Sequence, residues 1–367
     1  MNAIAVQANR TITASGFDPA LFTNFVSWLD RSARTTKTYL TNLRQFAAWL
    51  RFAGIDAPTR ESVIAFRDWL QSEHEAIVFD PICGFRYRLD AFGRQQRIVC
   101  KVTTIANYLR SVVQFFEWTS AAGLYPNIAS NIHAPKVRRD LHRKDALNAS
   151  DVLTIESSIK AQALARLGVE RERRKDNEGR IQRCSEQAAR LRAMYLLAVT
   201  AGLRCVELNR AKVRDLQIVG DRSFLMVWGK GRSEPDQRKA IPNEVVSALR
   251  EYLKTRKDGA PMNAPLFVST GNRSGGRPIA STTISKMLKH AMQAAGFDSE
   301  RLTAHSLRHT AGTAVQEITS DLYATQRFMR HQNPSTTEIY LHCQEEVKDS
   351  ELAQRLFDYY ERTANRE

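Results

Sequence analysis

Apolar residues recur every three or four positions through much of residues 17–130, which is the spacing of one buried face of an α-helix. In residues 35–55 this stripe consists of Tyr39, Leu43, Phe46 and Leu50. Residues 60–74 carry a shorter stripe of the same kind. Another stripe, in residues 103–126, consists of Ile105, Tyr108, Leu109, Val112, Phe115 and Phe116. The pattern predicts a helix over residues 17–54, followed by further helices.

The helical spacing stops between residues 75 and 100, where Pro81, Gly84 and Gly93 punctuate the chain. Proline and glycine favour turns, because proline lacks a backbone N–H and glycine tolerates a positive φ. We therefore expect a loop or an irregular hairpin here, inserted between helices. Residues 17–134 as a whole are predicted to form a small helical domain, preceded by a flexible N-terminus at residues 1–16.

Residues 135–147 show little periodicity and are rich in positive charge, which is typical of a basic linker between domains. The basic residues of this segment are Lys136, Arg138, Arg139, Arg143 and Lys144. Helical spacing returns from Ser150 onward, with a highly charged stretch at residues 166–186. Residues 148–367 are therefore predicted to form a second domain, with a C-terminal tail at residues 343–367.

Strand character appears within this second domain. The stretch SFLMVWGK, residues 223–230, is rich in apolar and aromatic residues, and RKAIP, residues 238–242, is a plausible partner strand after a turn. Helical patterns then resume at residues 243–256, 281–296 and 306–318. The predicted fold class is mainly α, with a small antiparallel β-sheet in the C-terminal domain.

The net charge of the chain indicates a class of binding partner. The chain has 54 Lys and Arg against 39 Asp and Glu, a formal net charge of +15. Such an excess attracts polyanions, and nucleic acid is the commonest of these, although a merely basic protein has the same composition. The five cysteines are odd in number and far apart, which argues against a disulfide framework and against a zinc cluster.

Neither a signal peptide nor a membrane span is expected. The first residues lack the basic start and long apolar run of a signal peptide, and no apolar run is long enough to cross a bilayer. We therefore expect a soluble cytoplasmic protein that has no contact with a membrane.

Basic residues stand at places where their chemistry is informative. Arg204 follows an apolar run, and Glu207 is the partner that a purely structural role for Arg204 would use. Lys230 stands between two glycines after a predicted strand, where a solvated turn lysine is the plain alternative. His305 and His309 are four residues apart, but Ser306 follows the first where a zinc-binding helix has Glu, so we expect no metal site.

The last informative stretch is RFMRHQNPSTTEIYLH, residues 327–342. Here His331 precedes Tyr340 by nine residues, and Tyr340 lies between Ile339 and Leu341. A tyrosine flanked by apolar residues is more often a packing residue than a nucleophile. Taken singly, each of these features favours the structural interpretation.

The order of the features changes that balance. TAGLRCVEL at residues 200–208 resembles the family pattern T-G-L-R-x-x-E-L, HSLRH at 305–309 is a complete H-x-L-R-H box, and a His followed nine residues later by Tyr completes the series. Together with GKG at 229–231, these boxes resemble the catalytic domain of the tyrosine recombinases, also called the phage integrase family. The N-terminal helices resemble the small core-binding domain of the same family.

The resemblance implies a fold and an activity. Two lobes would clamp double-stranded DNA, and four protomers would assemble as a homo-tetramer in the synaptic complex. The implied function is site-specific recombination through a 3′-phosphotyrosyl intermediate, in integration, excision or resolution, with no cofactor and no metal. The implied catalytic residues are Arg204, Lys230, His305, Arg308, His331 and the nucleophile Tyr340. The target sequence and any accessory proteins stay open.

The chain departs from the family pattern in places. Arg330 stands where the family usually has Gly, and the turn after Lys230 is long enough that Lys239 is a second candidate for the active-site lysine. The segments 75–100 and 166–186 look like insertions. Two rival functions use the same residues, namely a type IB topoisomerase and a non-catalytic DNA-binding protein on the same scaffold.

Overall fold

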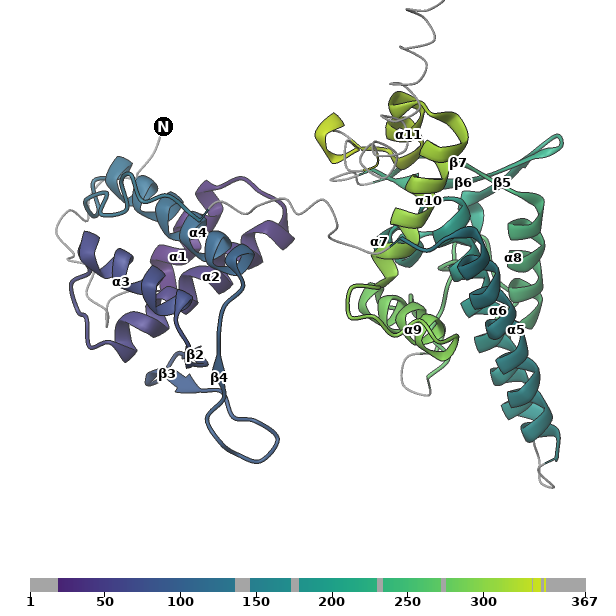
Figure 1. The fold of residues 1–367 in the computed structure, drawn as a ribbon, viewed down its shortest axis with the longest axis horizontal. Coiled ribbons are helices and arrows are strands. Elements are labelled where there is room, and N and C mark those ends of the chain that lie inside the picture. Colours follow the sequence, from purple (N-terminus) through teal and green to yellow (C-terminus); the bar gives the residue numbers. More distant parts are fainter. Residues whose placement is uncertain are drawn as a thin grey trace, which may run out of the picture. The chain divides into compact units, whose positions relative to one another are not determined.

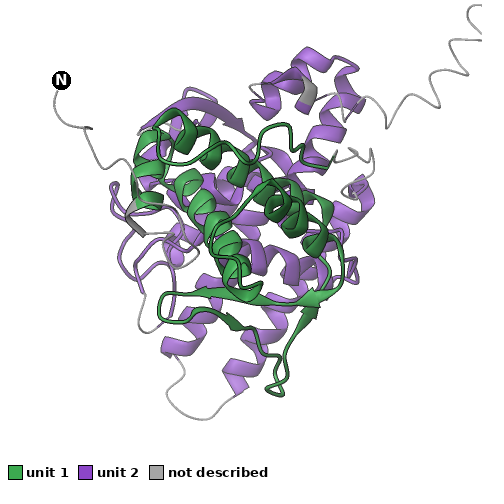
Figure 2. Ribbon diagram, turned by 90° about the vertical axis from the view of Figure 1, so that its left-hand side faces the viewer, with its two compact units in different colours: residues 1–139 green, residues 140–367 purple. Residues whose placement is uncertain are grey.

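The computed structural model divides into two compact units, residues 1–139 and residues 140–367 (Figure 2). The residues that it describes are 19–135, 146–172, 178–229, 234–271, 275–331, 333–337 and 340. The predicted N-terminus at 1–16, most of the basic linker, Lys230 and the tail at 343–367 lie outside the described residues.

The N-terminal unit is a small helical bundle (Figure 1). Its helices are α1 (Pro19–Trp28), α2 (Ala33–Phe52), α3 (Arg60–Gln71) and α4 (Val102–Ala121). The predicted single helix over residues 17–54 is wrong, because the chain turns between α1 and α2. Asp30 has a φ of 41°, and the Ser32 hydroxyl caps α2 by accepting a hydrogen bond from the Thr35 N–H at 3.3 Å. A hydroxyl cap satisfies one of the free N–H groups at a helix start.

Aromatic rings fill the core of this unit. The rings of Phe25, Phe46, Phe66, Phe115 and Phe116 are fully buried. Several meet edge to face, as Phe46 and Phe116 do at 6.1 Å between centroids, an arrangement that aromatic pairs prefer. Phe46, Phe115 and Phe116 belong to the helical stripes named in the sequence, so those stripes are the core-facing sides of α2 and α4.

Residues 75–100 form short antiparallel strand pairs between α3 and α4. Strand β1 (His74–Glu75) pairs with β4 (Arg97–Ile98), and β2 (Ile77–Asp80) pairs with β3 (Gly84–Tyr87). Figure 1 shows the strands projecting from one side of the bundle. The turns carry exposed apolar side chains, among them Ile82 and Phe92.

The C-terminal unit is also mainly helical, with one three-stranded antiparallel sheet in the order β5-β6-β7. Its helices are α5 (Ala149–Glu172), α6 (Glu178–Thr200), α7 (Cys205–Arg210), α8 (Asn243–Thr255), α9 (Ser281–Ala294), α10 (Ala304–Thr319) and α11 (Leu322–Met329). The strands are β5 (Leu216–Val219), β6 (Arg222–Trp228) and β7 (Pro235–Ile241). The predicted fold class is confirmed, and β6 and β7 are the strands that the sequence predicted as partners.

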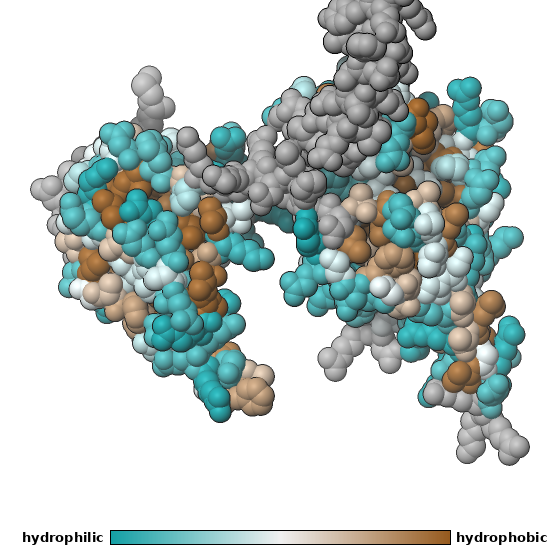
Figure 3. Space-filling view, in the orientation of Figure 1, coloured by the Kyte–Doolittle hydropathy of each residue, from teal (hydrophilic) through white to brown (hydrophobic). Residues whose placement is uncertain are grey.

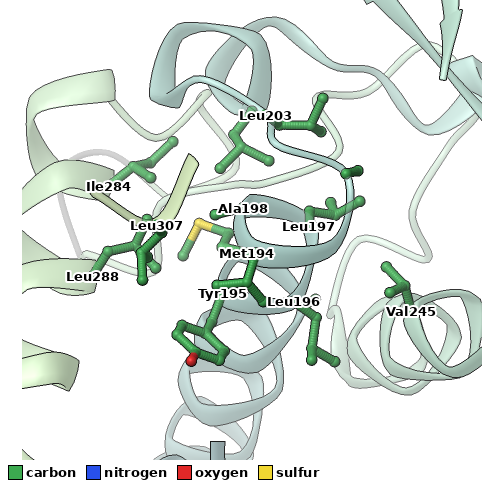
Figure 4. Close-up of a cluster of buried hydrophobic side chains, with 14 of the residues drawn as sticks. Met194, Tyr195, Leu196, Leu197, Ala198, Leu203, Val245, Ile284, Leu288 and Leu307 are labelled. Atoms are coloured by element: carbon green, nitrogen blue, oxygen red, sulfur yellow. The ribbon is translucent and has the colours of Figure 1, made fainter. Parts of the chain in front are cut away.

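A buried cluster of side chains around α6 holds the other helices in place (Figure 4). The central residues of α6 include Met194, Tyr195 and Leu197, all inaccessible to solvent. Leu307 of α10 and Leu288 of α9 pack into the same cluster. Burying each such side chain contributes roughly 1.5–3 kcal/mol. Because this core fixes α10 and the segment after α6, it also fixes the places of Arg308 and Arg204.

On the face shown in Figure 3, hydrophobic patches lie among hydrophilic residues on both units. One apolar region lies along the α5–α6 pair, where Leu164 and Val169 are exposed. No helix among the described residues is both long and apolar enough to span a bilayer.

Candidate active site

The carboxylate of Glu207 is the centre of a buried charge cluster. Its Oε2 accepts hydrogen bonds from the backbone N–H of Arg204 and from Nη2 of Arg330, both at 2.7 Å. Its Oε1 accepts a hydrogen bond from Nη1 of Arg204 at 2.9 Å. Burial acts to raise the pKa of Glu207, but Arg330 and the Arg204 groups outweigh it and hold the pKa below the ordinary value. Glu207 is therefore ionised and bridges two arginines.

Arg308 is the second guanidinium that the sequence singled out, and it is the most deeply buried. It projects from α10, has 2% of its surface exposed, and donates hydrogen bonds to the carbonyls of Gly202 and Met329. Those carbonyls belong to the segment before Arg204 and to the end of α11. Burial, followed by the charges of Arg204 and Arg330, lowers the pKa of Arg308 to about 9. The side chain is still charged at neutral pH.

The cluster has more positive than negative charge. Among the described residues that interact in it, three guanidinium groups face the single carboxylate of Glu207. A buried charge is expensive unless it is paired. The arrangement therefore favours an anion in the neighbourhood, and a phosphate with bidentate arginine contacts is a suitable one.

Lys239 lies in the same cluster. It comes from β7, has 6% of its surface exposed, and donates a hydrogen bond from Nζ to the Phe328 carbonyl at 2.9 Å. Its Nζ also sits 3.0 Å from the centroid of the Phe328 ring. Burial, then the charges of Arg330 and Arg308, lowers the pKa of Lys239 to about 6. Lys230, the lysine favoured by the sequence, is one of the residues outside the description.

Tyr340 lies beside histidine rings. Its ring is 2% exposed. Its centroid is 5.0 Å from that of His309 and 6.3 Å from that of His331, to which it is nearly parallel. The phenol lies near enough to Arg308 for the two side chains to interact electrostatically. The surroundings of Tyr340 are thus polar on these sides, although the residue is as buried as a core tyrosine.

His331 is held in the neutral form. Its Nδ1 lies 3.0 Å from the hydroxyl of Thr337, which is fully buried. Burial, followed by the charges of Arg308 and Arg204, lowers the pKa of His331 to about 4. The neutral imidazole keeps one N–H donor and one acceptor nitrogen, and a bound anion would favour its protonation.

His305 lies farther out, in the first turn of α10. It is exposed, and its ring centroid is 6.2 Å from that of His309. The structure therefore brings Arg204, Arg308, His331 and Tyr340 into one cluster, whereas His305 is exposed.

Sequence reasoning overlooked Gly312. This glycine is in the middle of α10, and a Cβ built on it would lie 2.5 Å from Cζ and 2.8 Å from Oη of Tyr340. The place of the phenol thus depends on a missing side chain. A glycine inside a helical pattern was the available signal, because it costs about 1 kcal/mol relative to alanine and so calls for a reason.

The part of the chain that the structure describes has no cluster of metal-ligating side chains. Within those ranges, no group of three or more His, Cys, Asp or Glu side chains is placed to hold a metal ion.

The N-terminal unit has a polar hollow of about 330 Å³ between α2 and α4. Its lining residues are Arg34, Thr35, Thr38, Tyr39, Asn42, Asn107, Arg110 and Ser111. Inside it, Nδ2 of Asn42 donates to Oγ of Ser111 at 2.9 Å, which holds the two helices at a fixed spacing. Amide, hydroxyl and guanidinium groups of this kind contact bases and phosphates in nucleic-acid complexes.

The sequence is similar to one family of known proteins. Residues 174–346 match the model of the phage integrase family. The chain is 31% identical over 170 residues to the tyrosine recombinase XerA of Pyrococcus furiosus. This alignment covers 45% of this chain and 56% of that protein. It is 29% identical over 255 residues to XerC of Vibrio campbellii, covering 68% of this chain and 70% of that protein. The chain spans about half the length of the first of these relatives.

Solved structures share the fold. A lambda integrase tetramer bound to a Holliday junction aligns with a TM-score of 0.56 at 16% identity, over 91% of this chain and 78% of that one. The site-specific recombinase XerH, bound to a palindromic difH substrate, aligns with a TM-score of 0.51 at 18% identity, over 69% of this chain and 67% of that one. At such identities the likeness establishes the fold.

Replacing Lys239 by methionine is expected to remove a pH dependence of stability. The pKa of this lysine is about 6 in the folded protein and near its ordinary value of 10.5 when unfolded. Between these values the unfolded chain binds more protons, so the free energy of unfolding of the wild type rises with pH from about 6 to about 10. This group contributes at most about 1.4 kcal/mol per pH unit.

Urea unfolding at several pH values between 6 and 9 measures the effect. The wild type should gain stability with pH relative to Lys239→Met, whereas exposed Lys286→Met should follow the wild type. Equal pH slopes for wild type and Lys239→Met would show that the buried amine is charged.

Proposed function

We propose that this chain belongs to the phage integrase family of tyrosine recombinases, and that it is a site-specific DNA recombinase that cleaves and rejoins strands through a 3′-phosphotyrosyl intermediate. One observation carries the proposal. The ring of Tyr340 lies against His309 and His331, in a cluster whose guanidinium groups exceed its carboxylates. A phenol in such surroundings suits attack on an anionic phosphodiester.

The first step makes one phosphoester and breaks another. The phenolic oxygen of Tyr340 attacks the phosphorus, the bond from phosphorus to the 5′-oxygen breaks, and the 3′ end stays joined to the enzyme. Negative charge builds on the non-bridging oxygens in the transition state, and Arg204 and Arg308 are our assigned donors to them. We assign the phenolic proton to His305, and a phosphate hydrogen bond to His331.

The leaving 5′-oxygen needs a proton, because an alkoxide is a poor leaving group. We assign Lys230 as its donor. Lys239 is the less suitable candidate, since its Nζ is buried against the ring and carbonyl of Phe328. Its depressed pKa would also leave it largely unprotonated at neutral pH before DNA binds.

The second step reverses the first with a different strand. A 5′-hydroxyl attacks the phosphotyrosine, and Tyr340 leaves with the proton restored. Each ester is exchanged for another of similar energy, so we propose that neither ATP nor a metal ion takes part. The positive charge that a metal would supply is already supplied by arginine side chains.

The assembly follows from the pairing of two DNA sites. We propose that the two units clamp double-stranded DNA, with the hollow between α2 and α4 as part of the contact surface. We propose four protomers in the synaptic complex, as in the lambda integrase tetramer bound to a Holliday junction. The relatives named above are recombinases, so the topoisomerase alternative is not favoured.

The central test is a covalent complex with DNA. The protein, incubated with nicked fragments from its own genetic neighbourhood, should form a denaturation-resistant adduct at a 3′ phosphate, and Tyr340→Phe should abolish it. Tyr323→Phe is the matched control, because Tyr323 is 69% exposed on α11. Gel electrophoresis of labelled DNA and peptide mapping give the attachment site. An adduct that survives in Tyr340→Phe refutes the assignment.

A modified leaving group distinguishes the roles of Lys230 and Lys239. Lys230→Ala should slow cleavage of ordinary DNA by about 10²–10⁴-fold, the usual range for a lost general acid. DNA with sulfur in place of the bridging 5′-oxygen should restore the rate, because a thiolate leaves without a proton. Lys239→Met should show no such rescue. Rescue of the Lys239 variant instead would reverse the assignment.

Gly312→Ala should separate stability from activity. Alanine favours the α10 helix by about 1 kcal/mol, but its Cβ demands that the phenol of Tyr340 move. A displacement of about 1 Å is able to cost about 10²-fold in rate. Single-turnover cleavage should therefore fall while thermal stability does not. The control is Gly168→Ala in α5, where a Cβ meets no atom within 4 Å; unchanged cleavage in Gly312→Ala would contradict the packing argument.

A further inference from the structure

Arg330 has a backbone conformation that an arginine rarely adopts. It is the C-cap of α11, with φ of 55° and ψ of 46°, in the left-handed region. Glycine reaches this region without strain, and the family pattern that the chain resembles usually has glycine at this position. Because the arginine carries a backbone cost that glycine would avoid, its side chain is expected to make a compensating contribution.

The side chain of Arg330 is turned inward. It is 8% exposed and donates from Nη2 to Oε2 of Glu207 at 2.7 Å. Its Nε and Nη1 are also buried, and neither has an acceptor among the residues that the structure describes. Buried donors of a charged group are nearly always hydrogen-bonded. The two unpaired N–H groups therefore call for an acceptor from outside the described residues.

The charges around Arg330 decide what kind of acceptor fits. Glu207 already shares its carboxylate with Arg204, so it does not neutralise both arginines. Arg308 adds a further buried positive charge, and its own acceptors are neutral carbonyls. The net charge of the side chains around Arg330 is positive, so an anion is the acceptor that fits best.

The position of Arg330 relative to the nucleophile identifies that anion. Arg330 immediately precedes His331, whose ring lies nearly parallel to that of Tyr340, and the carbonyl of Met329 on its other side accepts from Arg308. The charges of Arg204, Arg308 and Arg330 all depress the pKa of His331. An anion that contacts Arg330 therefore lies where the DNA phosphate is expected.

We propose that Arg330 is a third phosphate-binding guanidinium, which uses one of its unpaired N–H groups to donate to a non-bridging oxygen of the phosphodiester that Tyr340 attacks. The inference rests on the proposed recombinase function and deepens it, by giving the site an arginine beyond Arg204 and Arg308. The simplest competing role is a structural one, in which Arg330 serves only to neutralise Glu207.

An uncharged phosphate analogue distinguishes phosphate binding by Arg330 from a purely structural role. DNA with a methylphosphonate at the scissile position lacks the charged oxygen, so an arginine that serves this charge has little to contribute there. On ordinary DNA, Arg330→Gln should slow single-turnover formation of the covalent complex by about 10- to 100-fold, the range for a lost charged hydrogen bond. On methylphosphonate DNA the wild type and the variant should differ by less than about 3-fold.

Two further variants serve as controls for this experiment. Arg330→Gly relieves the left-handed backbone and should show the same dependence on the substrate, even if Arg330→Gln folds poorly. Arg327→Gln, on the exposed side of α11, is the matched control and should behave as wild type on both DNAs. Thermal unfolding of each variant establishes that it is folded.

Each outcome is decisive. Equal slowing of Arg330→Gly on both substrates would show a structural role and overturn the inference, as would an unchanged rate on ordinary DNA. Failure of the wild type to form any covalent complex would instead refute the proposed function, whatever the Arg330 variants do. Loss on ordinary DNA alone supports the phosphate contact.

Discussion

The carboxylate of Glu207 is the constraint on which the rest of the site depends. It joins the start of α7, through Arg204, to the end of α11, through Arg330. Arg308 joins the same two segments, because it donates hydrogen bonds to the carbonyls of Gly202 and Met329. Removing one partner of a buried ion pair typically costs about 3–5 kcal/mol. Segments more than 100 residues apart in the chain are thus held together by charge, over the apolar core around α6.

The helical framework was readable from the sequence because it depends on periodicity, which is local. The stripes of Leu43, Phe46 and Leu109 became buried faces of α2 and α4, and the strand at β6 was evident from its apolar run. The break between α1 and α2 was missed, although the large apolar residues stop at Leu29 and resume only at Tyr39. The short α11 was also missed, because eight residues give too few periods to detect.

The site was only partly readable. Arg204, Arg308, His331 and Tyr340 stand in recognisable boxes, and the Arg204–Glu207 pair weighed as a structural alternative exists alongside the rest of the cluster. The burial of Lys239 against Phe328 depends on how a strand meets a helix 89 residues later, which no spacing rule conveys. The role of Gly312 likewise emerges only when Tyr340 is folded back onto α10.

The burial of Tyr340 also has a consequence for the lifetime of the proposed covalent intermediate. With 2% of the residue exposed and a helix backbone directly against the ring, little space is left for solvent beside the oxygen that would bear the DNA. An ester formed there would be shielded from stray hydrolysis, which would otherwise leave a permanent break. The close fit between Gly312 and Tyr340 would then protect the proposed ester from water.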